Sequence, residues 1–393
     1  MKKIMKKAVN ILKYFKCLCL YYTALAASPF LKKKTEYSNL WLISERGADA
    51  RDNGYHFFRY LRQNHKEINC VYVIKRNCPD YEKIRVLGKT AEPGTFRHYL
   101  YFACAKYKVS THIMGYAPDS YRFAILDRIF GIVKGKKVFL QHGIIKDDIA
   151  ELHYPKVRLD MFVCSTIPEY NSVIEGYNFP DGIVKRIGLC RYDNLLSEHE
   201  IKRQILVMPT WRYYLRDMSE NDFKNSEYYT RFNGLINDEK LVKLLEEHDF
   251  EIAFYLHYEL QQFSELFSCK SPRVRIKSIK NSDVQELLME SAMLITDYSS
   301  VFFDFAYMKK PLLYWMFDRK LFFSEQYGEG YFKFEEAGFG PVFSKSEDVV
   351  DYIKRELENG MELEEKYQQR ISDTFSDFSD NHCQKTYEAI SKL

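Results

Sequence analysis

Residues 294–304 read Leu-Ile-Thr-Asp-Tyr-Ser-Ser-Val-Phe-Phe-Asp, and they are the clearest indication of the fold class. Its first three residues end a β-rich run, and Ser299 and Ser300 then open an amphipathic helical stretch. A strand that leads directly into a helix is half of a βαβ unit, which belongs to a parallel sheet. The free N–H groups of such a helix start favour an anion, although plain N-capping explains the same two serines.

The same alternation of β-rich runs and helical stretches continues on both sides, from Asn39 onward. The predicted strands of a first series are residues 40–44, 70–74, 107–111, 137–140, 161–164 and 184–187. Those of a second series are residues 204–208, 251–256, 274–277, 293–296 and 312–315. This pattern predicts an α/β protein with two doubly wound, Rossmann-like parallel-sheet domains. We expect a ligand in a cleft that the carboxyl ends of both sets of strands face.

The predicted domain limits follow from a charged stretch at residues 191–202, which separates the two series. They place an acceptor domain at residues 39–195 and a donor-binding domain at 196–370, with a basic segment (1–38) before them and a helical tail (371–393) after them. Apolar residues make up 46% of the chain and charged residues 28%, which excludes a mainly disordered protein. The nine cysteines include no CxxC pair, so we expect reduced thiols in a cytoplasmic protein, with no metal site and no cofactor.

The basic charge is concentrated at the N-terminus. Residues 1–40 contain nine lysines and one acidic residue, whereas the rest of the chain is slightly acidic. This distribution argues against a nucleic-acid partner. Ile4, Ala8, Ile11 and Phe15 recur at helical spacing among the lysines, which favours a helix lying in the surface of an anionic membrane. A signal peptide, a membrane-spanning helix and a solvated helix packed on the body are the alternatives.

Polar residues follow several predicted strands at the point where each ends. His142 follows the strand at 137–140 and suits a general base, although a histidine hydrogen-bonded in a turn is the alternative. Lys146, four residues later, could face an anion. Arg212 follows the strand at 204–208 and suits a phosphate, unless it is an ordinary surface arginine. His257 follows another strand, where a structural histidine is equally expected. The loop at 44–54 either meets an acceptor or caps the next helix.

Five ordered motifs resemble the CDP-glycerol glycerophosphotransferase family of teichoic-acid enzymes, over about residues 41–341. They are Glu45-Arg46-Gly47 with Asp49-Ala50-Arg51-Asp52-Asn53-Gly54, His142-Gly143 with Lys146-Asp147-Asp148, Pro209-Thr210-Trp211-Arg212, Leu256-His257-Tyr258, and Thr296-Asp297-Tyr298-Ser299-Ser300 with Asp304. The resemblance implies a GT-B fold in which the C-terminal domain holds the nucleotide. It also implies peripheral attachment to the cytoplasmic face of the cell membrane.

The implied reaction is the attack of an acceptor hydroxyl on the β-phosphorus of CDP-glycerol, with release of CMP. The resemblance assigns catalytic roles to His142 and His257. It assigns donor or substrate binding to Arg46, Asn53, Gly143, Lys146, Thr210, Arg212, Thr296, Asp297, Ser299, Ser300 and Asp304. The expected acceptor is a lipid-linked saccharide or polyol phosphate. Transfer from CDP-ribitol, a GT-B glycosyltransferase that uses a nucleotide sugar, and a non-catalytic membrane-bound scaffold are the alternatives.

Overall fold

The computed structural model describes residues 2–326 and 328–393, with residues 2–9 described by their backbone alone. The chain forms two compact units. The first comprises the residues up to Ile144, then Ile149–Asn194 and Ser379–Leu393, and the second comprises Ile145–Asp148 and Leu195–Phe378. Apart from the four residues at 145–148, the chain enters the second unit after Asn194 and returns to the first at Ser379, so the helical tail is divided between the two units.

The first unit is built on a seven-stranded sheet in the order β3-β2-β1-β4-β5-β6-β7, and every neighbouring pair is parallel. Its strands are β1 (Trp41–Ser44), β2 (Cys70–Val73), β3 (Lys89–Ala91), β4 (Tyr107–Ser110), β5 (Lys136–Phe139), β6 (Met161–Cys164) and β7 (Val184–Arg186). In this register Ser44 lies opposite Val73 of β2 and Ser110 of β4. The carboxyl ends of the central strands therefore meet at one edge of the sheet.

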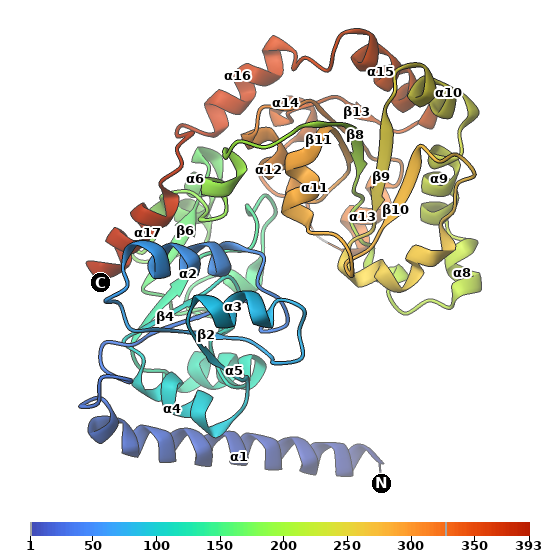
Figure 1. Ribbon diagram of the computed structural model, residues 1–393. Coiled ribbons are helices and arrows are strands. Elements are labelled where there is room, and N and C mark those ends of the chain that lie inside the picture. The colour runs from blue at the N-terminus through green and yellow to red at the C-terminus, as the bar shows by residue number, and fades with distance from the viewer. Residues whose placement is uncertain (1, 327) are drawn as a thin grey trace. The chain divides into compact units, whose positions relative to one another are not determined.

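The helices of the first unit begin at favourable capping residues. The side chains of Thr95, Asp119 and Thr166 each accept a hydrogen bond from the backbone N–H three residues later, as N-cap residues do. The helical segments are α1 (Lys2–Leu31), α2 (Asn53–Asn64), α3 (Tyr81–Leu87), α4 (Phe96–Cys104), α5 (Ser120–Phe130), η1 (Ala150–Leu152), α6 (Ile167–Gly176), α7 (Tyr192–Leu195) and α17 (His382–Ser391). The C-terminal α17 packs beside α2 (Figure 1).

The basic N-terminal segment forms one 30-residue helix, α1, which packs along α4 (Figure 1). One face of α1 is buried through Cys17, Tyr21, Ala24 and Ser28. The hydroxyl of Tyr21 donates to the carbonyl oxygen of Ile132 at 2.8 Å. Within the described residues, no helix has the length and apolar character needed to span a bilayer. The side chains of Ile4 and Ala8, part of the predicted apolar repeat, lie outside those described.

The second unit is built on a six-stranded parallel sheet in the order β10-β9-β8-β11-β12-β13. Its strands are β8 (Lys202–Val207), β9 (Glu251–Tyr255), β10 (Val274–Lys277), β11 (Ser291–Thr296), β12 (Leu312–Trp315) and β13 (Val342–Phe343). Its helical segments are η2 (Tyr213–Leu215), α8 (Glu220–Lys224), α9 (Glu227–Ile236), α10 (Glu239–Glu247), η3 (Tyr258–Leu266), α11 (Val284–Glu290), α12 (Val301–Tyr307), α13 (Arg319–Glu325), α14 (Phe334–Ala337), α15 (Ser346–Glu358) and α16 (Glu365–Thr374).

Each unit has its own apolar core. In the second unit, Trp315 of β12 is fully buried, with the ring of Phe232 edge-on at 5.0 Å. In the first unit, Phe102 and Phe123 pack at 4.9 Å, and Tyr21 of α1 joins them. The prediction of two doubly wound parallel sheets is confirmed. The short strands β3 and β13, which have three and two residues, were not predicted because runs of that length carry no clear periodicity.

Candidate functional site

In the first unit, polar residues gather where β1, β4 and β5 end. His142 lies just beyond β5, and His112 lies just beyond β4. Their imidazole rings stack with centroids 4.5 Å apart and an angle of 12° between the planes. The structure thus places the predicted His142 at the carboxyl edge of the sheet. It adds His112, which the sequence analysis did not single out although it also follows a strand.

The hydrogen bond of His142 sets the chemistry available at its ring. Its Nδ1 lies 3.3 Å from the carbonyl oxygen of Thr111, and a carbonyl only accepts, so Nδ1 carries the proton. The neutral ring then has its lone pair on Nε2, as a general base requires. The His142 side chain is partly accessible to solvent, yet desolvation by the surrounding protein lowers the pKa of its imidazole below 6.5, an effect that the charge of Asp52 opposes. His142 is therefore neutral at pH 7.

His112 is held neutral more strongly than His142. Burial, followed by the neighbouring His142, lowers the pKa of His112 to about 3. Its Nδ1 lies 2.9 Å from the hydroxyl of Thr111. A neutral ring stacked on His142 fixes the plane of that imidazole without adding a positive charge beside it.

A buried side chain, Asn53, fixes the loop that carries His142. Its amide nitrogen donates to the carbonyl oxygen of Gln141 at 2.8 Å, and its amide oxygen accepts from the backbone N–H of Arg191 at 2.9 Å. Gln141 has a φ of +62°, a left-handed conformation that needs such support. The sequence predicted that Asn53 binds substrate. The structure instead buries it completely and uses its amide within the protein.

Arg191 ties the same loop to the start of α2. Its guanidinium donates to Asp52 at 2.8 Å and to the backbone oxygen of His142 at 3.1 Å. Asp52 is the N-cap of α2, so the capping interpretation of the loop at 44–54 is confirmed for this residue. The sequence analysis missed Arg191 because it lies in the stretch that was assigned to a domain boundary.

Glu45 organises the turn after β1. Its two carboxylate oxygens accept from the backbone N–H groups of Arg51, Asp52 and Tyr55 at 2.7–3.1 Å. Gly54 is required beside it, because a Cβ there would lie 2.8 Å from Cγ of Glu45. The predicted substrate-binding Arg46 remains partly exposed at this turn and pairs with Asp49 at 2.5 Å.

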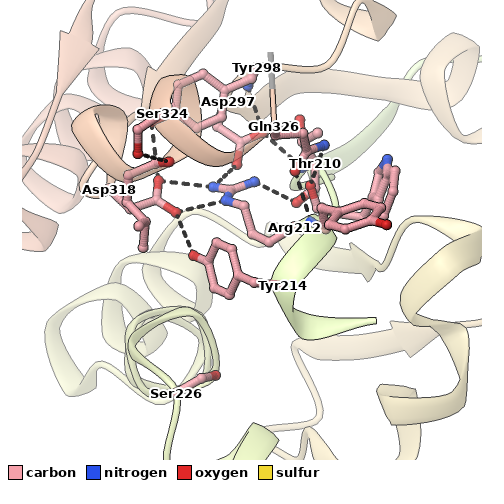
Figure 2. Close-up of polar contacts among 12 residues, drawn as sticks. Thr210, Arg212, Tyr214, Ser226, Asp297, Tyr298, Asp318, Ser324 and Gln326 are labelled. Carbon is pink, nitrogen blue, oxygen red and sulfur yellow. Dashed lines mark hydrogen bonds and ion pairs between the residues drawn. The ribbon is translucent and has the colours of Figure 1, made fainter. Parts of the chain in front are cut away.

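In the second unit, Arg212 is the centre of a buried ion cluster (Figure 2). Its Nε donates to Asp318 at 2.7 Å, and its Nη2 donates to Asp297 at 2.8 Å and to Asp318 at 3.1 Å. Its Nη1 donates to the carbonyl oxygen of Thr210 at 2.6 Å. Burial by itself would lower the pKa of Arg212, but the carboxylates of Asp297 and Asp318 together raise it above its ordinary value. The sequence predicted a phosphate contact, whereas here the guanidinium is enclosed by protein acceptors.

Three other predicted binding residues belong to the same buried region. Asp297 accepts from the backbone N–H and the hydroxyl of Thr210, at 2.7 Å and 2.5 Å. The hydroxyl of Thr296 donates to the carbonyl oxygen of Met208 at 2.8 Å. Thr210, Thr296 and Asp297 are all buried, so in this structure they join the ends of β8 and β11. Asp318, which follows β12 and completes the cluster, was not singled out from the sequence.

The loop after β11 exposes two serines beside this cluster. Tyr298, which precedes them, is fixed by a hydrogen bond to Asp318 at 3.1 Å and by stacking on Phe322 at 3.8 Å. Ser299 and Ser300 remain partly exposed. Ser299 accepts weakly from the N–H of Val301 at 3.4 Å, whereas Ser300 makes no capping hydrogen bond with its side chain.

Two further predicted binding residues are buried in the second unit. Asp304 lies in the first turn of α12 and is 4% exposed. Lys146 is equally buried and forms an ion pair with Asp147. Gly143 stays partly exposed in the first unit, next to His142. The predicted contacts of these residues with a ligand stay predictions.

His257 begins η3 just beyond β9, on the edge that also carries Ser299. Its Nδ1 accepts from the backbone N–H of Glu259 at 3.4 Å, which leaves the proton of the neutral ring on Nε2. The ring lies nearly parallel to that of Trp211, with centroids 6.1 Å apart. His257 is thus arranged to donate a hydrogen bond, the opposite of His142. Among the described residues, no group of three or more His, Cys, Asp or Glu side chains could hold a metal ion.

Two parallel-sheet units of this kind define the GT-B class of fold. The solved structure of the wall teichoic acid polymerase TagF is similar over 99% of this chain and 98% of its own, with a TM-score of 0.68 and 18% identity. UDP-GlcNAc 2-epimerase from Neisseria meningitidis is similar over 90% of this chain and all of its own, with a TM-score of 0.54 and 10% identity. These likenesses concern the fold alone.

The sequence comparison identifies the family. Residues 25–392 match the family described as CDP-Glycerol:Poly(glycerophosphate) glycerophosphotransferase, and the chain belongs to it. The minor teichoic acid biosynthesis protein GgaB of Bacillus subtilis is 32% identical over 90% of this chain, which spans 40% of GgaB. The teichoic acid poly(glycerol phosphate) polymerase of Bacillus spizizenii is 25% identical over 82% of this chain and 76% of its own length. The predicted family is thereby confirmed.

Proposed function

We propose that this protein transfers a glycerol phosphate unit from CDP-glycerol to a hydroxyl group of a membrane-linked acceptor during teichoic-acid synthesis, with release of CMP. Family membership over residues 25–392 is the observation that carries the proposal. A TagF variant has been solved after a soak with CDPG, which supports the choice of donor. The acceptor is a lipid-linked saccharide or a polyol phosphate.

The proposed chemistry uses the opposite tautomers of the two histidines. Nε2 of His142 takes the proton from the acceptor hydroxyl, whose oxygen bonds to the β-phosphorus as the bond from that phosphorus to the oxygen of CMP breaks. Nε2–H of His257 donates to a phosphate oxygen as charge builds on the departing CMP. Ser299 and Ser300 supply further donors to the pyrophosphate. Positioning and electrostatics would provide most of the rate enhancement.

The buried polar clusters have a positioning role in this proposal. Arg212 fixes the loop that carries the two serines, and Asn53 fixes the loop that carries His142. Neither side chain needs to touch substrate to affect the reaction.

The test is release of CMP from CDP-glycerol and, separately, from CDP-ribitol, each with a lipid-linked acceptor. We expect release with CDP-glycerol, and a decrease in turnover of about 10²–10⁴ in His142→Ala, the usual contribution of a positioned base. His199→Ala, at an exposed histidine, is the matched control. Near wild-type turnover in His142→Ala would remove the assignment of the base.

Release of CMP with CDP-ribitol alone would identify CDP-ribitol as the donor. Transfer of a sugar from a nucleotide sugar, with release of a nucleoside diphosphate, would instead indicate a glycosyltransferase. No turnover with any donor would favour the scaffold alternative.

We also propose that α1 holds the protein on the cytoplasmic face of the cell membrane. The face of α1 opposite its buried side exposes Ile11, Leu12 and Phe15 by 66–68%, and Phe30 by 73%. Lys13 and Lys16 are exposed among them. An exposed apolar stripe bordered by lysines suits the interface of an anionic membrane.

Point substitutions are the sharper test of this attachment, because Tyr21 and Ala24 of α1 are part of the core and deletion of the helix would expose it. Leu12→Asp combined with Phe15→Asp should abolish co-sedimentation with anionic vesicles. Val86→Asp and Ile201→Asp, at exposed apolar residues outside α1, should leave this co-sedimentation unchanged. Unchanged vesicle binding in the α1 variant would refute the attachment.

A further inference from the structure

The first unit contains a basic cavity at the edge of its sheet opposite to His142. The cavity measures about 700 Å³ and lies where the amino ends of β4, β5 and β6 meet the end of α1. Four lysines line it, Lys32, Lys106, Lys134 and Lys136, together with Asp160 and the backbone carboxyl end of Leu393. A volume of this size is typical of sites for small organic ligands.

Three of the four lysines form no ion pair with an acidic side chain among the described residues. Lys136 pairs with Asp160 at 3.1 Å. Lys32, Lys106 and Lys134 are exposed, and no acidic group among the described residues forms an ion pair with them. Three ammonium groups around one cavity repel each other, and an anion bound between them would relieve that repulsion.

A fifth lysine, Lys108, lies next to Gly135 of the cavity lining. Lys108 of β4 is buried and donates to the carbonyl oxygens of Ala105 and Lys134, at 2.9 Å and 2.5 Å. It has no carboxylate partner among the residues described. Burial, with a contribution from the charge of Lys32, lowers the pKa of Lys108 to about 7.

The floor of the cavity is a tight backbone crossing. Gly135 has a φ of +85°, and a Cβ there would lie 2.6 Å from the carbonyl oxygen of Ala105 and 2.9 Å from Nζ of Lys108. Only glycine allows the 134–136 segment to pass this close, which brings Lys134 and Lys136 to the same cavity as Lys106. Ser38 and Asn39 line it as well and add polar groups that can bind hydroxyls.

We propose that this cavity binds a phosphodiester or phosphomonoester that also carries hydroxyl groups, such as a glycerol phosphate unit. The chemistry is shared by the head group of a phospholipid and by a segment of a polyol phosphate chain. The lysines supply the charge and the polar rim binds the hydroxyls. The site is separate from the proposed transfer chemistry, because it lies at the opposite edge of the sheet from His142.

The test compares Lys106→Glu/Lys134→Glu with Lys33→Glu/Lys34→Glu. The second pair makes the same change in net charge at exposed lysines that follow α1 but do not line the cavity. One arm measures binding of soluble sn-glycerol 3-phosphate by calorimetry, and the other measures binding to phosphatidylglycerol vesicles. The protein is the full chain carrying His142→Ala, so the outcome does not depend on turnover. Because each substitution removes a charged hydrogen-bond donor, we expect a decrease in affinity of about tenfold or more for the cavity variant in at least one arm.

The arm that shows the decrease identifies the source of the ligand. A decrease for the soluble probe indicates a free polyol phosphate, and a decrease for the vesicles alone, larger than that of the control pair, indicates a lipid head group. An equal decrease in both variants would mean diffuse attraction and would overturn the site, as would unchanged affinity in both arms. The milder Lys106→Ala/Lys134→Ala repeats the test if the charge reversal lowers the thermal stability of the protein.

Discussion

Replacement of Arg212 by methionine separates a structural role of this arginine from a ligand-binding role. The guanidinium makes four hydrogen bonds of 2.6–3.1 Å, three of them to two aspartates. The side chains of Asp297 and Asp318 are 0% and 3% exposed, so the substitution would leave two carboxylates buried without their cation. Removal of one partner from a buried ion pair costs about 3–5 kcal/mol.

The expected consequence is a large loss of stability. For a unit of this size, 1 kcal/mol corresponds to about 2–4 °C in the melting temperature, so Arg212→Met should lower it by about 6–20 °C. Arg212→Lys keeps the charge but not the forked geometry, so its melting temperature should lie between those of Arg212→Met and the wild type. The control is Arg216→Met, which breaks a pair with Glu259 in which the arginine is 49% exposed and should cost about 0–1 kcal/mol.

Thermal unfolding followed by tryptophan fluorescence is the assay, because Trp211 and Trp315 report on the second unit. Titration of each folded variant with CDP-glycerol provides the second readout. If Arg212→Met is as stable as Arg216→Met but loses the donor, the arginine contacts the phosphate directly and the structural role is refuted. If stability falls and the folded fraction still binds the donor, the structural role holds.

Three further outcomes follow from the first unit. Since the protein lowers the pKa of His142 and the neutral ring is the base, kcat/KM should rise with pH and reach half its maximum below pH 6.5; a midpoint above 6.5 would contradict this. Asn53→Ala should destabilise the protein by about 1–3 kcal/mol by leaving buried partners unsatisfied, and should lower kcat more than it raises KM; unchanged stability and kcat would show that Asn53 does not fix the loop. Burial lowers the pKa of His98 to about 4, so the unfolded state binds a proton first and stability should fall as the pH falls from about 6.5 to 4. His98→Gln should show a smaller decrease in urea midpoint over that range, and an identical decrease would refute the assignment.

The sequence by itself determined the architecture and the positions of most loops that carry polar groups. Strand runs such as 161–164 are apolar and include aromatic and β-branched residues, and helical stretches such as 167–176 begin after a capping threonine. Both signals are local, so they are readable without the fold. The ordered motifs were equally readable, and the family that they predicted is confirmed.

Which motif residues face outward and which are enclosed became known from the three-dimensional packing. Arg212, Asn53 and Asp304 lie in motifs that suggest ligand contact, yet each is buried. The partners that enclose the first two, Asp318 and Arg191, are far away in the sequence. Hydrogen-bond partners also fixed the opposite tautomers of the two histidines, which no spacing rule reveals. Residue type is a local property, whereas burial and pairing depend on long-range packing, and for this reason the sequence placed the site but not the roles within it.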